Sequence, residues 1–254
     1  MLLAIDVGNT NIVMGVFDND KLITSGRLST DIYQTDEEYA MKINSFLVLH
    51  RITDIDSAIL SSVVPALVRT LKNAVKLITK KDCLVVGPGV KTGLSLKIDN
   101  PSQLGSDLVV GAVAAKQKYP LPIILFDLGT ATTATIINKN GEFIGGMIMA
   151  GVKTSINALT ANTAQLPQID ISAPSKLIGT NTIDCMKCGA VIATASMLDG
   201  LVERFEEILN EKASCVITGG LAGPIVKYCR HNMIVDENLL LDGLNIIHNK
   251  NKNS

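Results

Sequence analysis

Two short segments of the chain combine an acidic residue, a glycine and small polar residues in the same order. The first is Asp6-Val7-Gly8-Asn9-Thr10-Asn11 and the second is Asp127-Leu128-Gly129-Thr130, with Thr132 and Thr133 as further donors. Each follows a short apolar run, so each predicts a turn at the end of a buried strand. Glycine lets backbone N–H groups approach phosphate oxygens, and a carboxylate is a hard oxygen ligand for the accompanying cation. The two turns therefore predict a site for a nucleotide with its metal.

The two turns belong to an internal repeat. Residues 3–23 can be laid over residues 124–144 without a gap, so that Asp6 falls on Asp127, Gly8 on Gly129 and Ile23 on Ile144. Any two β-hairpins share some likeness, so a chance match is the alternative interpretation. Two identical Asp-x-Gly turns in one ungapped match favour a duplication. Duplicated halves imply two similar domains that face one another with a cleft between them.

A third glycine segment, Thr218-Gly219-Gly220, follows the apolar run 215–217 and precedes a predicted helix. The glycine pair could let a strand end pass close to a flat adenine or a ribose. On its own, the segment is equally well explained as an ordinary strand-to-helix turn. The chain contains no G-x-x-x-x-G-K-[ST] loop, and no G-x-G-x-x-G follows its first strand. These absences argue against a Walker loop and a dinucleotide-binding fold.

Short apolar runs alternate with longer amphipathic stretches, which is typical of an α/β fold. Predicted strands cover residues 2–5, 12–17, 57–61, 83–86, 123–126, 133–137 and 215–217, and predicted helices cover 36–49, 64–78, 106–118, 188–209 and 224–229. The proline-rich segment at 119–122 predicts a domain boundary. We therefore expect domains at 1–118 and 119–254, with a frayed polar tail at 249–254.

Composition limits the possible partners of the chain. Among 254 residues, 23 Lys and Arg oppose 24 Asp and Glu, which gives a net charge of −1, without the basic excess of a nucleic-acid binder. Mean hydropathy is +0.31, yet the best apolar run, at 108–115, is far shorter than the roughly 20 residues of a membrane span. The start of the chain has no basic leader, and five cysteines do not make a disulfide framework. We expect a reduced cytoplasmic protein that binds neither membranes nor nucleic acids.

The pair Cys185 and Cys188 has metal-ligand spacing. No second pair and no suitably spaced histidine completes a zinc site. The pair is therefore better interpreted as small buried residues at the start of a helix.

Read together, the segments resemble one known family. They are Asp6 to Asn11, Ser61-Ser62-Val63-Val64-Pro65, Asn100-Pro101 through Gly105-Ser106-Asp107, Asp127 to Thr133, Gly145-Gly146-Met147-Ile148, Gly179-Thr180-Asn181-Thr182 and Thr218-Gly219-Gly220. In this order, over nearly the whole chain, they resemble the type III pantothenate kinases, within the superfamily of actin, hexokinase and acetate kinase. The resemblance implies duplicated actin-like (ribonuclease H-like) domains with an ATP cleft between them. It also implies ATP-dependent phosphorylation of pantothenate, the first step towards coenzyme A.

The resemblance also implies roles for single residues. Asp107 would be the catalytic carboxylate that takes the proton of the hydroxyl, and Asp127 would bind a monovalent cation, K⁺ or ammonium. Thr182 would contact pantothenate across a homodimer interface. The residues expected to bind ATP with Mg²⁺ are Asp6, Val7, Gly8, Asn9, Thr10, Asn11, Ile12, Val13 and Thr130, with Asp6 near the Mg²⁺ and with Gly219 and Gly220 added on the glycine argument above. Pantothenate would contact Ile98, Gly105, Ser106, Asp107, Leu108 and Thr182.

Asp107 can also be considered without the family. It lies at a predicted helix start, where the helix dipole favours a carboxylate. The dipole and a nearby cation would lower its pKa and make it a weak base, which suits phosphoryl transfer because this reaction needs positioning more than a strong base. The alternative interpretation is a helix N-terminal acid of no chemical importance.

Four positions depart from the family pattern, which has Tyr-x-Asn-Pro followed by Gly-Ala-Asp-Arg. The Tyr position is Ile98, the Ala position is Ser106 and the Arg position is Leu108, while the proline of a later Gly-Gly turn is Ala150. The Tyr and Arg positions are those expected to contact pantothenate. Two interpretations stay open: tolerated drift in a working enzyme, or a divergent paralogue. Such a paralogue would have another small hydroxyl acceptor or a regulatory role like that of the Bvg accessory factors.

Overall fold

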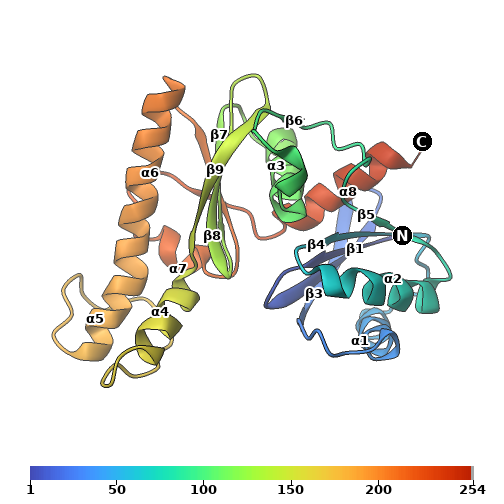
Figure 1. Ribbon diagram of the computed structural model, residues 1–254, viewed down its shortest axis with the longest axis horizontal. Coiled ribbons are helices and arrows are strands. Elements are labelled where there is room, and N and C mark those ends of the chain that lie inside the picture. The colour runs from blue at the N-terminus through green and yellow to red at the C-terminus, as the bar shows by residue number, and fades with distance from the viewer. Residues whose placement is uncertain (253–254) are drawn as a thin grey trace. The chain divides into compact units, whose positions relative to one another are not determined.

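The computed structural model describes residues 1–252 as two compact units (Figure 1). Unit 1 comprises Met1–Leu94, Asp99–Ala114 and residues 238–252, and unit 2 comprises Ser95–Ile98 and Ala115–Glu237. The chain therefore passes between the units several times, inside what the sequence predicted to be two continuous domains.

Unit 1 is built on a five-stranded sheet of order β3-β2-β1-β4-β5. The first three strands form an antiparallel meander, and β4 and β5 run parallel to β1. The strands are β1 (Leu2–Val7), β2 (Asn11–Asp18), β3 (Lys21–Ser29), β4 (Ser57–Ser62) and β5 (Cys83–Val85). The helices are α1 (Asp36–Leu49), α2 (Pro65–Thr79), the 3₁₀ turn η1 (Pro101–Gln103), α3 (Ser106–Lys118), whose residues from Ala115 onward belong to unit 2, and α8 (Leu239–Asn251).

Alternation along β1 explains how this sheet is covered. Leu3 and Ile5 pack with buried residues of α1 and α2, whereas Leu2 and Ala4 pack with buried residues of α3 and α8. Successive side chains of a strand point to opposite faces, so every residue of β1 is buried. The carboxyl end of β1, where the first predicted turn begins, is thereby held between two helical layers.

Unit 2 is built on a six-stranded sheet of order β11-β10-β7-β8-β9-β6. The strands are β6 (Ser95–Leu96), β7 (Ile123–Leu128), β8 (Ala131–Ile137), β9 (Glu142–Ala150), β10 (Ser214–Thr218) and β11 (Ile234–Val235). The helices are α4 (Val152–Ala161), α5 (Thr182–Cys188), the π-helical η2 (Gly189–Ala193), α6 (Thr194–Leu209) and α7 (Ala222–Val226). One face of the β7-β8 hairpin packs against α4, α5, η2 and α6 in a single hydrophobic core.

The two sheets confirm the duplication, with one correction. In both units an antiparallel meander is followed by a strand parallel to its first member. Asp6 pairs with Val13, however, whereas Asp127 pairs with Thr133, so the second turn is one residue shorter. The next turn is one residue longer, because Phe17 pairs with Leu22 and Ile137 with Phe143. The ungapped match is therefore right for β1 with β7 and for β3 with β9. It is wrong by one residue for β2 with β8, the middle strands of the two meanders.

The helix predicted at 188–209 is longer than expected. Helices α5, η2 and α6 form a continuous segment, Thr182–Leu209, that is long and apolar enough by length and composition to cross a membrane. Polar residues interrupt the segment, so it does not stand out in the sequence as one apolar run. Its buried residues, among them Leu198 and Val202, belong to the core of unit 2. A single helix of this kind, whose buried residues pack in the core of unit 2, is weak evidence for a membrane span.

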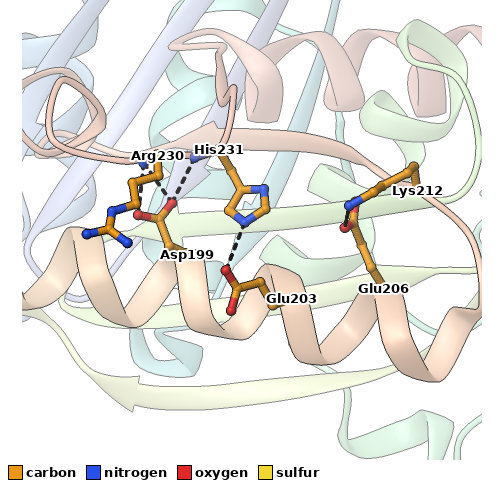
Figure 2. A network of polar contacts seen from close by, with 6 residues as sticks. All are labelled: Asp199, Glu203, Glu206, Lys212, Arg230 and His231. Carbon is orange, nitrogen blue, oxygen red and sulfur yellow. Dashed lines mark hydrogen bonds and ion pairs between the residues drawn. The ribbon is translucent and has the colours of Figure 1, made fainter.

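The polar side of α6 holds the segment that follows α7 (Figure 2). Both oxygens of the buried Asp199 carboxylate accept the backbone N–H of Arg230, at 3.0 and 2.8 Å, and Oδ1 also accepts that of His231 at 3.0 Å. One turn along, Glu203 Oε1 lies 3.6 Å from His231 Nε2. These contacts fix the backbone that leads into β11.

The C-terminal residues correct the predicted domain bounds. Helix α8 belongs to unit 1, not to a C-terminal domain, because Leu241 and Leu244 pack against the unit 1 sheet. The tail expected to fray is helical as far as Asn251, whose side chain pairs with both backbone groups of Lys91 at 3.1 and 2.9 Å. The last two residues of that predicted tail lie outside the described residues.

Candidate active site

The first glycine turn joins β1 to β2 and is closed by backbone and side-chain hydrogen bonds. Gly8 N–H donates to Asn11 O at 2.9 Å. Thr30, just after β3, donates its N–H to Thr10 O at 3.0 Å and its Oγ1–H to Gly8 O at 2.7 Å. Three contacts thus fix a turn whose tip residues, Asn9 and Thr10, are exposed.

Within the segment 6–13, the side chains divide between core and turn. Those of Val7 and Ile12 are buried in the core of unit 1. Only their backbone groups are therefore placed to contact a bound ligand. The Asp6 carboxyl side chain lies at the end of β1 and is 6% exposed.

The second turn, between β7 and β8, is closed by equivalent hydrogen bonds. Gly151, just after β9, donates its N–H to Thr130 O at 3.1 Å, and Thr154 Oγ1–H donates to the same oxygen at 2.7 Å. Gly151 must be a glycine, since a Cβ there would lie 2.4 Å from the carbonyl oxygens of both Gly129 and Thr130. Gly151, Thr154 and Thr30 lie outside the motifs that the sequence singled out. Continuing the repeat beyond residue 144 would have found Gly151, which falls at the position of Thr30.

The shortened second turn moves one predicted donor away from it. Thr132 was expected to offer its hydroxyl to the turn, but its side chain is 1% exposed. It lies on the same face of β8 as Ala134, which packs in the hydrophobic core beneath the helices. Thr132 is therefore not a donor at this turn. Thr130 remains exposed at the tip.

The third glycine segment lies beside the second turn. Thr218 pairs with Asp127 in the parallel register of β10 and β7. Gly219 has φ +96°, and a Cβ there would lie 2.6–2.7 Å from the backbone of Leu128. Both the left-handed backbone and the close approach require glycine. Unit 2 thus brings together Asp127, Thr130 and the start of the Gly219-Gly220 pair.

Asp107 lies in the first turn of α3, as predicted. Its Oδ1 accepts the N–H of Leu108 at 2.8 Å. Burial raises the pKa of the Asp107 carboxyl above its ordinary value, and backbone N–H groups lower it by less. Desolvation outweighs the helix N-terminus, so the dipole alone does not lower the pKa as predicted. A Cβ at Gly105 would lie 2.4 Å from Asp107 Oδ1, so a larger residue there would force the carboxylate to shift.

Ser106 proves to be held by the strand β4. Its Oγ accepts from Ser61 Oγ at 2.9 Å and from Ser62 N–H at 3.1 Å, and it donates to Ser62 O at 3.0 Å. The Ser106 hydroxyl, which was expected to contact a substrate, thus makes hydrogen bonds that attach the start of α3 to β4. Ser61, fully buried, was noticed only as part of a motif.

The remaining predicted substrate residues are divided between the units. Leu108 is half-buried in unit 1, beside Asp107. Ile98 is half-buried in unit 2, and Thr182 is the exposed first residue of α5, which Asn181 caps through Asp184 N–H at 2.9 Å.

The cysteines form no metal centre. Within residues 1–252, no cluster of three or more His, Cys, Asp or Glu could hold a metal ion, and all five cysteines are free. Cys185 is exposed, which corrects the prediction that it is buried. Its thiol donates to Gly179 O at 3.4 Å, and that of Cys188 donates to Lys176 O at 3.1 Å.

Comparison with known proteins shows the family and the fold of the chain. The family model of type III pantothenate kinase matches residues 2–204. A type III pantothenate kinase from Exiguobacterium sibiricum is 43% identical, covering 99% of this chain and 100% of its own. Among solved structures, a Baf family protein from Campylobacter jejuni has a TM-score of 0.60 at 20% identity, covering 99% of this chain and 100% of its own. A ROK family glucokinase from Streptomyces griseus, in complex with glucose and AMPPNP, has a TM-score of 0.50 at 14% identity, covering 100% and 99%. The fold is thus that of the actin-like kinases, and the chain belongs to the type III pantothenate kinase family.

Proposed function

We propose that this chain transfers the terminal phosphoryl group of ATP to the primary hydroxyl of pantothenate, as the first step of coenzyme A synthesis in the cytoplasm. The observation that supports nucleotide binding is the pair of equivalent turns. Each has a carboxylate near the end of the preceding strand. In each, the residue just after the third strand of the meander donates its backbone N–H to a carbonyl oxygen at the tip of the turn. Family membership supports the acceptor.

The residues fit a nucleotide with its cation. Because the described residues hold no ready-made metal cage, a divalent ion would take most of its ligands from phosphate oxygens and water, as Mg²⁺ with a nucleotide commonly does. Asp6 would hold this ion, the backbone of residues 6–13 would line the phosphates, and Thr130 would contact ATP. Gly219 and Gly220 would lie against the adenosine. When bound, the ion supplies charge neutralisation on the phosphoryl group.

On the acceptor side, Asp107 would accept the proton of the hydroxyl. The hydroxyl oxygen forms a bond to the γ-phosphorus, the bond from that phosphorus to the bridging oxygen breaks, and ADP leaves with the electron pair. Burial raises the pKa of Asp107, which makes its carboxylate a better base than an exposed one. Gly105, Ser106 and Leu108 would shape the acceptor site around it, together with Ile98.

Asp127 would bind a monovalent cation, K⁺ or ammonium. We expect Asp127→Ala to abolish the dependence of activity on that ion, because a half-buried carboxylate supplies the charge that holds it. Titration of activity against KCl in both proteins measures this. Asp170→Ala, in an exposed part of the same unit, serves as the control. If the Asp127→Ala curve overlays the parent curve, the cation role is excluded.

The chain would act as a homodimer, with Thr182 contacting pantothenate in the site of the neighbouring copy. Exposed apolar side chains on unit 2, including Ile148, Leu177 and Ile178, support an interface there. We expect sedimentation at micromolar concentration to give a dimer. A monomer alone would contradict the shared site.

A second candidate is a divergent paralogue with another hydroxyl acceptor or a regulatory role. Leu108 favours it, because an apolar side chain beside Asp107 cannot make the charge-assisted contact expected of the family's arginine. An ADP-release assay with Mg²⁺ and K⁺, run with and without pantothenate, separates the two. ADP release that requires pantothenate supports the kinase. Nucleotide binding without pantothenate-dependent turnover supports the paralogue.

A further inference from the structure

Two cysteines lie one helical turn apart near the start of the continuous helical segment Thr182–Leu209. Cys185 is exposed and Cys188 is half-buried. A spacing of three residues in an α-helix brings the two Cα atoms to about 5 Å from one another, and disulfides join Cα atoms that are roughly 4.4–6.8 Å apart. A disulfide between these two side chains therefore requires no unfolding of the helix.

The other three cysteines of the chain are poorly suited to the same chemistry. Burial raises the pKa of the Cys83 thiol to about 12, and that of the Cys215 and Cys229 thiols to about 11. Because the thiolate is the form that attacks a disulfide, these three groups react slowly. Oxidation of the chain is thereby directed to Cys185 and Cys188.

The thiols of Cys185 and Cys188 attach the preceding loop to the helix. Cys185 Sγ donates to Gly179 O at 3.4 Å, and Cys188 Sγ donates to Lys176 O at 3.1 Å. Gly179 lies directly against the helix, since a Cβ there would lie 2.4 Å from the backbone nitrogen of Cys185. The loop leads directly into Thr182, the first residue of α5 and the residue proposed to contact pantothenate.

A disulfide would remove both of these contacts together. It has no S–H group, so neither sulfur could donate to a carbonyl oxygen. The two sulfurs must also turn toward each other to bond at about 2.0 Å, whereas the thiols point to carbonyl groups three residues apart in the loop. The carbonyl groups of Lys176 and Gly179 would then lose their thiol partners, which releases the loop that precedes Thr182.

We propose that Cys185 and Cys188 are a redox pair whose disulfide releases loop 176–181 and weakens the use of pantothenate. The regulatory part rests on the proposed function, through Thr182. The oxidant is a low-molecular-weight disulfide, RS–SR. The deprotonated sulfur of Cys185 attacks one sulfur of RS–SR and the first RS⁻ leaves, and the deprotonated sulfur of Cys188 then attacks Cys185 Sγ and expels the second RS⁻. The two cysteine protons end on these leaving groups, so the two electrons that the cysteines lose reduce RS–SR to two RSH.

The test treats the full chain with 2-hydroxyethyl disulfide and follows its intact mass, the bridged peptide and its cleavage by trypsin. We expect the mass to fall by two hydrogen atoms, with the bridge between Cys185 and Cys188. Trypsin should cleave faster after the exposed Lys176 in the loop, and at an unchanged rate after the exposed Lys139 between β8 and β9. Dithiothreitol should reverse the changes. A lasting mixed disulfide on the parent chain, a bridge between other cysteines, or unchanged cleavage after Lys176 would overturn the proposal.

The consequence for the acceptor site is measured in the same samples. Oxidation should raise the KM for pantothenate about five- to tenfold, the worth of two weak hydrogen bonds, and leave the Kd for ATP unchanged. A bridged chain with the KM of the reduced chain would refute the regulatory role. If the reduced chain shows no pantothenate-dependent turnover, the proposed function fails and the regulation with it, whereas mass and cleavage still decide whether the redox pair exists.

Serine variants identify the two thiols. The double variant Cys185→Ser, Cys188→Ser keeps hydroxyl donors for both loop carbonyls but cannot form a bridge, so it should match the reduced parent and ignore the oxidant. Cys188→Ala, the second variant if the double variant fails to fold, should stop at a mixed disulfide on Cys185. Cys229→Ser, at a half-buried cysteine elsewhere in unit 2, is the control and should respond like the parent. Faster cleavage after Lys176 in the oxidant-treated, folded double variant would refute the assignment.

Discussion

Replacing Asp107 by asparagine is expected to lower kcat by about 10²–10⁴-fold, the usual worth of a general base. The Kd for ATP should stay close to the parent value, because this side chain would serve the acceptor hydroxyl and not the nucleotide. Asparagine preserves the shape of the side chain and can still accept the Leu108 N–H through its amide oxygen, so the start of α3 should persist. Steady-state ADP release and calorimetric titration with an ATP analogue measure the two quantities.

The control is Asp99→Asn, an exposed acid in the same unit, which should retain parental turnover. The pH profile gives a further check. Because burial raises the pKa of Asp107, its carboxylate becomes protonated at a higher pH than an ordinary aspartate, whose pKa is about 3.9. The acid limb of kcat/KM should therefore fall above that value and vanish in Asp107→Asn. An Asn variant with a large fraction of parental turnover would refute the assignment.

Leu108→Arg is expected to improve kcat/KM for pantothenate by about one to two decades. A charge-assisted contact to the substrate or the transferring group is worth roughly 1.5–3 kcal/mol, and each tenfold corresponds to about 1.4 kcal/mol. The parent should therefore use pantothenate with a high KM while its ATP parameters are ordinary. Steady-state kinetics on both proteins decide this, with Leu108→Met as an apolar control that should recover nothing.

Ile98→Tyr combined with Leu108→Arg should recover more than the single variant if the two positions border one pocket. A parent that already binds pantothenate tightly and gains nothing from the arginine would contradict the prediction. Another donor, such as Lys97 or Arg27, would then take its place. If no variant phosphorylates pantothenate although ATP binds, the paralogue becomes the better account.

The sequence predicted the parts of the fold that depend on local pattern. The repeat placed Asp6 and Asp127 at equivalent strand ends, because each follows a continuous apolar run and precedes a glycine turn. The repeat could not show that β8 is shifted by one residue relative to β2. Apolar residues of β2 fall on apolar residues of β8 in the ungapped alignment and in the shifted one alike. For this reason the sequence placed the Thr132 hydroxyl in the second turn, although it is buried.

Other features depend on contacts between distant segments. Helix α8 joins unit 1 through side chains such as Leu244 that pack on a sheet whose last strand, β5, ends at Val85. The pKa of Asp107 is set by burial, and Ser106 is occupied by Ser61 and Ser62. Neither a helix dipole nor a motif predicts how much water the fold removes from a side chain.

The most direct test of the central claim is to incubate the purified chain with ATP, Mg²⁺, K⁺ and pantothenate and to determine the mass of the products. The account predicts that pantothenate gains one phosphoryl group, that ADP appears in equal amount, and that Asp107→Asn forms neither at a comparable rate. ADP formed without phosphorylated pantothenate, or no turnover in a parent protein that binds ATP, would contradict it.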